Sequence, residues 1–430
     1  MTGANVRVAI AGSGCVLASG WGVQRFWSAA SEARSGIALL QSKLFYSERV
    51  AAFGHVAEED HQRSRQDVAQ NLQRYCPPAV IWGVSAVRQA LHDAGLQPGN
   101  DGVRYGLYCC QGGYTHPSIA AYGELLHECR DQRRAEPGDE SRDESCDQSG
   151  ADMQRLARRV LQERALDPFL VLKSLSNGLL GIISLALKLE CECNAYMQGV
   201  AGNLAAMREA CAALQSGRID AAIVVGAGSE LDPLALAALA DAGVVSTEGS
   251  HDMLAFDRRG TGGIAGEGAA ALILRRADDL PPGPKTCVAG LYAHARLDAL
   301  SLPDKQADLL ISSASGDPQK DADLARTLAR VGAAHITSAA SVTGILSGAP
   351  SLVDLILAHH ALQAQSVPPI IGLQQSVDAH LPFVLGERRD AVLHDCLIIN
   401  RDSNGFSACY QLDYQYEHQH EHQHEHQLAR

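Results

Sequence analysis

KLECECNAYMQGVAGNLAAMREACAALQSGRIDAAIVVGAGSE, residues 188–230, is the stretch that decides the fold. The run Cys191–Tyr196 predicts a short buried strand, and the alanine- and leucine-rich run after it predicts a helix, because both residues are good helix formers. Ser216–Arg218 closes that helix, with Gly217 available for a left-handed cap. The apolar run Ala221–Gly226 then predicts a second buried strand. This succession of strand, helix and strand indicates an α/β fold.

The sharp turn at residues 198–202, between the first strand and the helix, is the candidate site. Such a turn points a side chain at a substrate and at the positive N-terminus of the helix, and it normally carries a nucleophile. Here the turn and the start of the helix offer Gln198, Val200 and Asn203, none of which is a nucleophile. The layout of a covalent site is therefore present without the reactive group.

Composition narrows the class of protein. The chain has 430 residues, of which 46% are hydrophobic and 20% charged, an ordinary globular balance with ample material for a core. The net charge of −13 argues against nucleic acid or an anionic membrane as the main partner. The negative charge does not exclude an acidic carrier protein as a partner, since one local basic patch on this chain is enough to bind it. No stretch approaches ~18 consecutive apolar residues and the N-terminus lacks a signal-peptide pattern, so we expect a cytoplasmic protein without a membrane partner.

Cysteines and glycines raise the question of metals and cofactors. The 12 cysteines are scattered without paired CxxC motifs, which is typical of reduced thiols. Two pairs of cysteines could instead ligate a metal: Cys109–Cys110 and Cys191–Cys193. Cysteines that are adjacent or alternate within apolar runs, however, are more often buried thiols of the core. Gly12–Gly14 lacks the third glycine of a dinucleotide fingerprint. We expect neither a metal nor a cofactor.

Two segments differ in composition from the rest. Residues 130–150, inside an insertion of about 128–155, carry many charges and almost no large apolar side chains, which predicts a mobile surface loop. A docking surface for a partner is the alternative. Residues 413–430 are predicted to be a disordered tail, in which an EHQHEHQHEHQ repeat carries five histidines. Weak binding of a transition metal is the alternative there.

Several motifs resemble those of the β-ketoacyl-acyl-carrier-protein synthases of the thiolase superfamily. Val200 lies sixteen residues before Ser216, the spacing at which that family places its cysteine. Residues 252–274 resemble the family's P-F-D-x-x-R-x-G-x-x-x-G-E-G-A motif, and residues 167–189 resemble a helix that packs at its subunit interface. The resemblance implies a thiolase-like five-layer α-β-α-β-α fold built from two similar βαβα halves, which we place at 1–250 and 251–412.

The resemblance also locates the family's catalytic positions. Its nucleophilic cysteine corresponds to Val200, its two histidines to Ser313 and Ile345, and its lysine to Ala340. In the family the thiolate accepts the acyl group, the histidines stabilise the oxyanion, and the lysine polarises the site. Valine cannot form a thioester and isoleucine cannot donate to an oxyanion, so the resemblance implies a chain that is not catalytic by itself.

A chain with the fold of a β-ketoacyl synthase but without its catalytic residues resembles the chain-length factor, or β-subunit, of type II polyketide ketosynthases. The loop Ser312–Asp321 is similar to the corresponding loop of that subfamily, and Gly112–His116 resembles the segment that carries its chain-length residues. The resemblance implies a heterodimer with an active ketosynthase α-subunit, contact with an acyl carrier protein, and an acyl tunnel for an aromatic or aryl-polyene chain. The tunnel positions that it assigns are Tyr114, Thr115, Ser118, Gln198 and Phe406.

Two other functions stay open. A catalytically active β-ketoacyl synthase or thiolase with an atypical nucleophile would form an acyl adduct without a partner. A free-standing, acyl-binding pseudoenzyme scaffold would be a stable homodimer that needs no ketosynthase.

Overall fold

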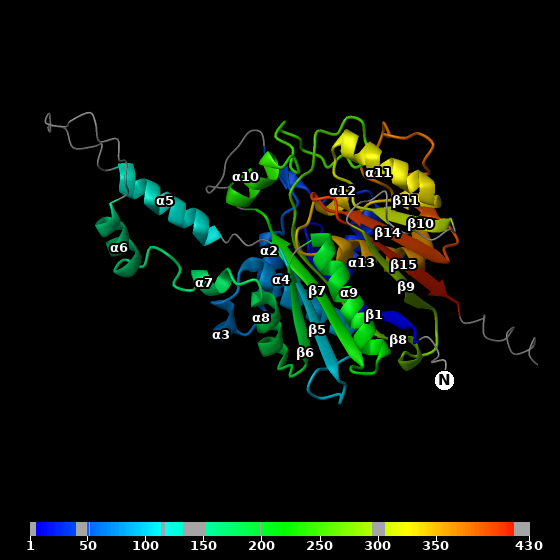
Figure 1. Ribbon diagram of the computed structural model, residues 1–430, viewed down its shortest axis with the longest axis horizontal. Coiled ribbons are helices and arrows are strands. Elements are labelled where there is room, and N and C mark those ends of the chain that lie inside the picture. The colour runs from blue at the N-terminus through cyan, green and yellow to red at the C-terminus, as the bar shows by residue number, and fades with distance from the viewer. Residues whose placement is uncertain are drawn as a thin grey trace, which may run out of the picture.

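The computed structural model describes residues 6–39, 50, 52–112, 117–131, 152–197, 199–231, 233–294 and 306–416. Its centre is a mixed sheet of 11 strands (Figure 1). An N-terminal set runs in the order β6 (Glu192–Met197), β5 (Tyr105–Gln111), β7 (Ala221–Ser229), β8 (Glu267–Arg276) and β1 (Val8–Leu17), with β2 (Gly20–Trp21) paired to β1. A C-terminal set continues with β9 (Lys285–His294), β15 (Ser407–Gln415), β14 (Asp395–Arg401), β10 (Ala307–Ser312) and β11 (Ala333–Thr337).

The two sets of strands meet along a short junction. β1 pairs with β8 along most of its length, and it meets β9 through the pairs Val8–Val288 and Ala9–Cys287. Two further short pairs belong to other sheets: β3 (Ala38–Leu39) with β4 (Ala52–Phe53), and β12 (Ser366–Val367) with β13 (Arg389–Asp390).

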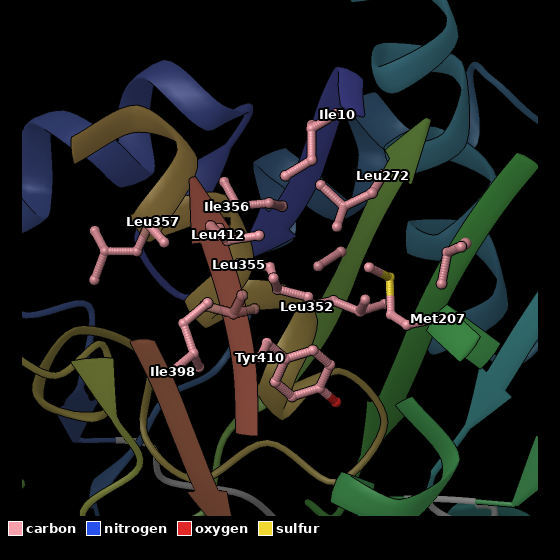
Figure 2. Packing of buried hydrophobic residues seen from close by; sticks show 14 of the residues in the cluster. Ile10, Met207, Leu272, Leu352, Leu355, Ile356, Leu357, Ile398, Tyr410 and Leu412 are labelled. Atoms are coloured by element: carbon pink, nitrogen blue, oxygen red, sulfur yellow. The ribbon is translucent and has the colours of Figure 1, made fainter. Parts of the chain in front are cut away.

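Two helices form the central layer. α9 (Gly199–Gln215) and α13 (Pro350–Ala364) contact each other and strands of both sets. Eleven of the 15 residues of α13 are buried, because sheets cover it from both sides. Figure 2 shows its leucines converging with side chains of β1, β8, β14, β15 and α9. This cluster is the main core, since burial of apolar surface is the dominant favourable contribution to folding.

Helices also cover the outer faces. α4 (Pro78–Asp93) and α8 (Gly178–Leu187) pack on the N-terminal set, and α11 (Pro318–Val331) packs on the C-terminal set. The layers are therefore α-β-α-β-α, which confirms the predicted thiolase-like fold. The division at residue 250 stays a prediction; β8, which follows it, pairs with β1 and β7 of the N-terminal set.

Eight further α-helices and one 3₁₀ helix complete the described part of the chain. None of the helices in the described ranges combines the length and apolar character needed to span a bilayer. The helices not yet named are α1 (Val23–Ser31), α2 (Glu58–Arg65), α3 (Gln70–Gln73), α5 (Pro117–Asp131), α6 (Met153–Leu161), α7 (Leu170–Lys173), α10 (Pro233–Asp241), α12 (Ala340–Thr343) and the 3₁₀ helix η2 (Ala277–Asp279).

The glycines of the Gly12–Gly14 run serve packing. A Cβ atom on Gly12 would lie 2.4 Å from the carbonyl oxygen of Ala90, and one on Gly14 would lie 2.2 Å from that of Ala86. Both carbonyls belong to α4, so glycine is what allows this helix to lie directly on β1.

One prediction about the decisive stretch is wrong. The strand over 191–196 was expected to be buried, whereas β6 is the edge strand of the sheet and its residues are half-buried or exposed. Its alternation of cysteine, glutamate and asparagine fits an edge, where one side of the strand has no neighbouring strand. The helix and the second strand match α9 and β7, and Gly217 has the expected positive φ of 71°.

The segment between β5 and β6 extends away from the body of the molecule. α5 and α6 pack together through Leu125, Cys129 and Leu156, and Figure 1 shows them projecting beside α7. The predicted insertion 128–155 thus begins in α5 and ends in α6, and residues 132–151 lie outside the described ranges. The interface helix expected over 167–189 is divided into α7 and α8. The first residues of the predicted tail, 413–415, are not disordered but form the end of β15, and residues 417–430 lie outside the described ranges.

Candidate functional site

The structure brings the four predicted catalytic positions together. A cavity of about 550 Å³ opens where α9, α12 and the loops after β10 and β14 meet, and Val200, Ser313, Ala340 and Ile345 all line it. Val200 is the second residue of α9 and is 3% exposed. Ala340 begins α12, and Ile345 follows that short helix.

Glycines build the turn that presents Val200. Gly199 has a φ of +75°, and its N–H donates to the carbonyl oxygen of Ser347 at 2.8 Å. A Cβ atom on Gly202 would lie 2.5 Å from the carbonyl oxygen of Met197, so the first turn of the helix folds back tightly on the strand. The sharp turn predicted from the sequence is present, and the buried Val200 that follows Gly199 lines the cavity.

Asn203 has a structural task. Its Nδ2 donates to the carbonyl oxygen of Gly348 at 2.9 Å, and its Oδ1 accepts from the N–H of Ser351 at 3.1 Å. The side chain is fully buried and links α9 to the start of α13. It therefore fixes one central helix against the other and does not face a substrate.

A Pro-x-x-Asp motif, residues Pro318–Asp321, holds the loop that carries Ser313. Asp321, nearly fully buried, accepts from the Ser315 N–H at 2.7 Å, the Ser315 hydroxyl at 2.8 Å and the Phe256 N–H at 2.9 Å. The Ser313 hydroxyl in turn accepts from the Arg401 N–H at 3.3 Å. These bonds tie the loop to both neighbouring segments, so the motif persists for a structural reason.

A buried acid lies in the wall of the cavity, and our sequence analysis missed it. Asp354 is 3% exposed, and its carboxylate accepts from Asn400 Nδ2 at 2.6 Å. Burial raises the pKa of Asp354 to about 7. Asn400 is fully buried, and its Oδ1 has no hydrogen-bond partner among the described residues. The available signal was one aspartate inside the otherwise apolar run of α13.

Among the described residues, the lining of the cavity lacks the groups of a condensing site. Neither a cysteine nor a histidine is among the described residues that line it. The Ser315 hydroxyl donates to Asp321, whose carboxylate is already held by backbone N–H groups. Cys110 lies in the core behind the sharp turn that precedes α9. Burial raises the pKa of Cys110 to about 12, so its thiol stays protonated at neutral pH.

The predicted tunnel positions are only partly visible. Tyr114, Thr115 and Gln198 lie outside the described residues, and Ser118 lies in α5. Phe406 immediately precedes β15, is half-buried, and packs against the main core. Its N–H donates to the Asp402 carboxylate at 3.0 Å, which closes a loop whose residues 401–404 line the cavity.

Comparison with known proteins defines the family. Residues 5–279 match the model for the β-ketoacyl synthase N-terminal domain, so the chain belongs to the β-ketoacyl synthase family. Within it, the chain is 25% identical over 432 aligned residues to the tetracenomycin polyketide synthase ketoacyl synthase beta subunit of Streptomyces glaucescens. That alignment covers 93% of this chain and 97% of the subunit.

Two solved structures share the fold. The ishigamide ketosynthase/chain length factor matches with a TM-score of 0.75 at 18% identity, covering 95% of this chain and 99% of that one. AntDE:AntF, a type II polyketide synthase acyl-carrier protein in complex with its ketosynthase, matches with a TM-score of 0.68 at 17% identity, covering 95% of this chain and 100% of that one. The predicted resemblance to type II polyketide synthase β-subunits is thereby confirmed.

Proposed function

We propose that this chain is the non-catalytic β-subunit of a type II polyketide ketosynthase, a chain-length factor that pairs with an active α-subunit and shapes its acyl tunnel. One observation carries the proposal. The positions that hold cysteine, histidine, lysine and histidine in the family line a single cavity here, and they hold Val200, Ser313, Ala340 and Ile345. Valine and isoleucine can neither form a thioester nor donate a proton to an oxyanion.

The surface around β6 supports the pairing. β6 is an open sheet edge, and an exposed edge offers unpaired N–H and C=O groups to a second chain. Large apolar side chains are exposed on β6 itself and on α8 next to it, and also on α6 and α7 in the segment that extends from the body, and such surfaces mark protein interfaces. Examples are Leu161 at 77%, Val171 at 75%, Leu185 at 62% and Met197 at 56% exposed.

The relatives indicate which partner covers this surface. The relative from Streptomyces glaucescens is named a beta subunit, and AntDE:AntF contains a ketosynthase together with its acyl-carrier protein. By analogy, we infer a ketosynthase α-subunit on this chain and an acyl carrier protein that serves the pair. The product class, aromatic or aryl-polyene, stays open. The 11 cysteines of the described chain are all free thiols, which fits the cytoplasm.

In this proposal Tyr114, Thr115, Ser118, Gln198 and Phe406 contribute to the tunnel wall. Extra bulk in a packed site costs about 1–3 kcal/mol, enough to stop a growing chain. Replacing Tyr114 with alanine in the reconstituted pair is expected to lengthen the product. An unchanged distribution of product lengths would count against this assignment.

Co-expression tests the pairing. The chain is produced with the ketosynthase encoded beside it, and the mixture is separated by size-exclusion chromatography. We expect a stable 1:1 complex that persists at high salt, since the contact surface is apolar. Leu185→Asp, on the exposed side of α8, is expected to weaken the complex, and Leu39→Asp, exposed outside the proposed interface, is the matched control. A homodimer that ignores the ketosynthase would support the free-standing scaffold instead.

A further inference from the structure

The cavity next to Val200 has an unusual balance of polar groups. Five of the charged side chains that line it are acidic and two, Lys320 and Arg401, are basic. The acidic ones are Glu230, Asp321, Asp323, Asp354 and Asp402. Lys320 is already engaged, because its Nζ donates to the carbonyl oxygen of Gly243 at 2.7 Å. The excess of negative charge favours a cation over an anion in this space.

Asp354, one of the buried acids of this set, forms no ion pair with a described residue. Asp354 lies in α13, with its Asn400 and Ala339 hydrogen bonds as its contacts to donors. Burying a carboxyl without a cation is costly, and burial accordingly raises its pKa. Asn400, bonded to it, has a second acceptor oxygen that is buried and unpartnered among the described residues. The Asp354 carboxylate, which lines the cavity, would be satisfied by a hydrogen-bond donor that carries a positive charge.

The rest of the wall is apolar. Val200, Ala340 and Ile345 contribute short aliphatic side chains to it. A cavity of about 550 Å³ is in the range of small-molecule sites. It would enclose a molecule with a few carbon atoms and one polar end.

We propose that this cavity binds a short alkyl primary amine as its ammonium ion, with the nitrogen at Asp354 and the alkyl chain against Val200 and Ile345. The ammonium ion carries hydrogen-bond donors and a positive charge, both of which match the Asp354 carboxylate. The inference rests on the proposed function only in that the cavity performs no condensation.

Binding of n-butylamine to the purified protein tests the inference, measured by calorimetry and by thermal shift. n-Butanol, with the same carbon chain but no charge, and n-butyrate, with the opposite charge, are the control probes. We expect binding of butylamine with millimolar affinity, at least tenfold tighter than butanol, and no binding of butyrate. Equal affinities for the three probes, or no binding of butylamine, would overturn the inference.

Variants locate the site. Asp354→Asn is expected to weaken butylamine binding at least tenfold. Ala340→Lys is expected to raise the melting temperature and abolish binding, because it supplies an internal ammonium to Asp354. Ala340→Met fills the same space without a charge, so it is expected to abolish binding without that gain in stability. Full binding by both position-340 variants would refute the location, even if Asp354→Asn did not fold. Complex formation with a ketosynthase is measured separately and does not depend on these results.

Discussion

Replacing Asn203 with alanine tests how the central layer is held together. The side chain makes two buried hydrogen bonds, to the Gly348 carbonyl and to the Ser351 N–H. The substitution leaves both backbone groups buried without partners, since the two central helices enclose them. Each unsatisfied group costs about 1–3 kcal/mol, so the expected loss is about 2–6 kcal/mol. This is a large part of the 5–15 kcal/mol that is typical of folded domains.

Urea unfolding followed by circular dichroism measures this loss. Asn194→Ala is the matched control, because Asn194 is exposed on β6 and its Nδ2 contacts Glu209 at 3.1 Å. We expect the control to change the free energy of unfolding by less than about 0.5 kcal/mol. A loss below about 1 kcal/mol in Asn203→Ala would refute the assignment of Asn203 as the link between α9 and α13.

Three further outcomes are expected. Gly14→Ala should destabilise the fold by about 3 kcal/mol, because its Cβ atom would overlap the Ala86 carbonyl, whereas Gly181→Ala, which meets no atom within 4 Å, should gain up to about 1 kcal/mol; urea midpoints compare them. His359→Gln should flatten the acid side of the stability profile. Burial lowers the pKa of His359 to about 3 in the folded protein, while the pKa in the unfolded chain is about 6.5. The contribution of His359 to the free energy of unfolding is therefore fully present above pH 6.5. It is lost as the pH falls towards 3, by up to about 1.4 kcal/mol per pH unit. If wild type and variant lose stability in parallel over that range, His359 is not the group responsible. Val200→Cys should place a thiol at the start of α9 without creating a condensing enzyme, since none of the described residues that line the cavity is a histidine. Product formation by this variant alone, measured by mass spectrometry, would contradict that expectation.

Local sequence was a good guide to the elbow. Three positions of this stretch require the backbone freedom or the small size of glycine: Gly199, Gly202 and Gly217. These requirements arise from neighbours only a few residues away, so the local sequence reveals them. The joining of Val200 with Ser313, Ala340 and Ile345 was predicted from the family's motifs. No spacing rule would have brought Val200 together with positions more than a hundred residues later in the chain.

Other features depend on contacts that a sequence does not announce. The burial of β6 was predicted wrongly because strand propensity does not tell an edge strand from a central one. Asn203 stands at the candidate turn in sequence, yet its side chain points to α13. Asp354 becomes notable only when Asn400, on a distant strand, is seen beside it. Each case depends on which segments the topology places next to one another.

The central claim is that this chain supports a condensation carried out by another subunit. Intact-mass spectrometry of the reconstituted pair, after exposure to an acyl-loaded carrier protein, tests it most directly. We predict an acyl adduct on the ketosynthase and an unchanged mass for this chain. An acyl adduct on this chain, in the pair or alone, would contradict the claim.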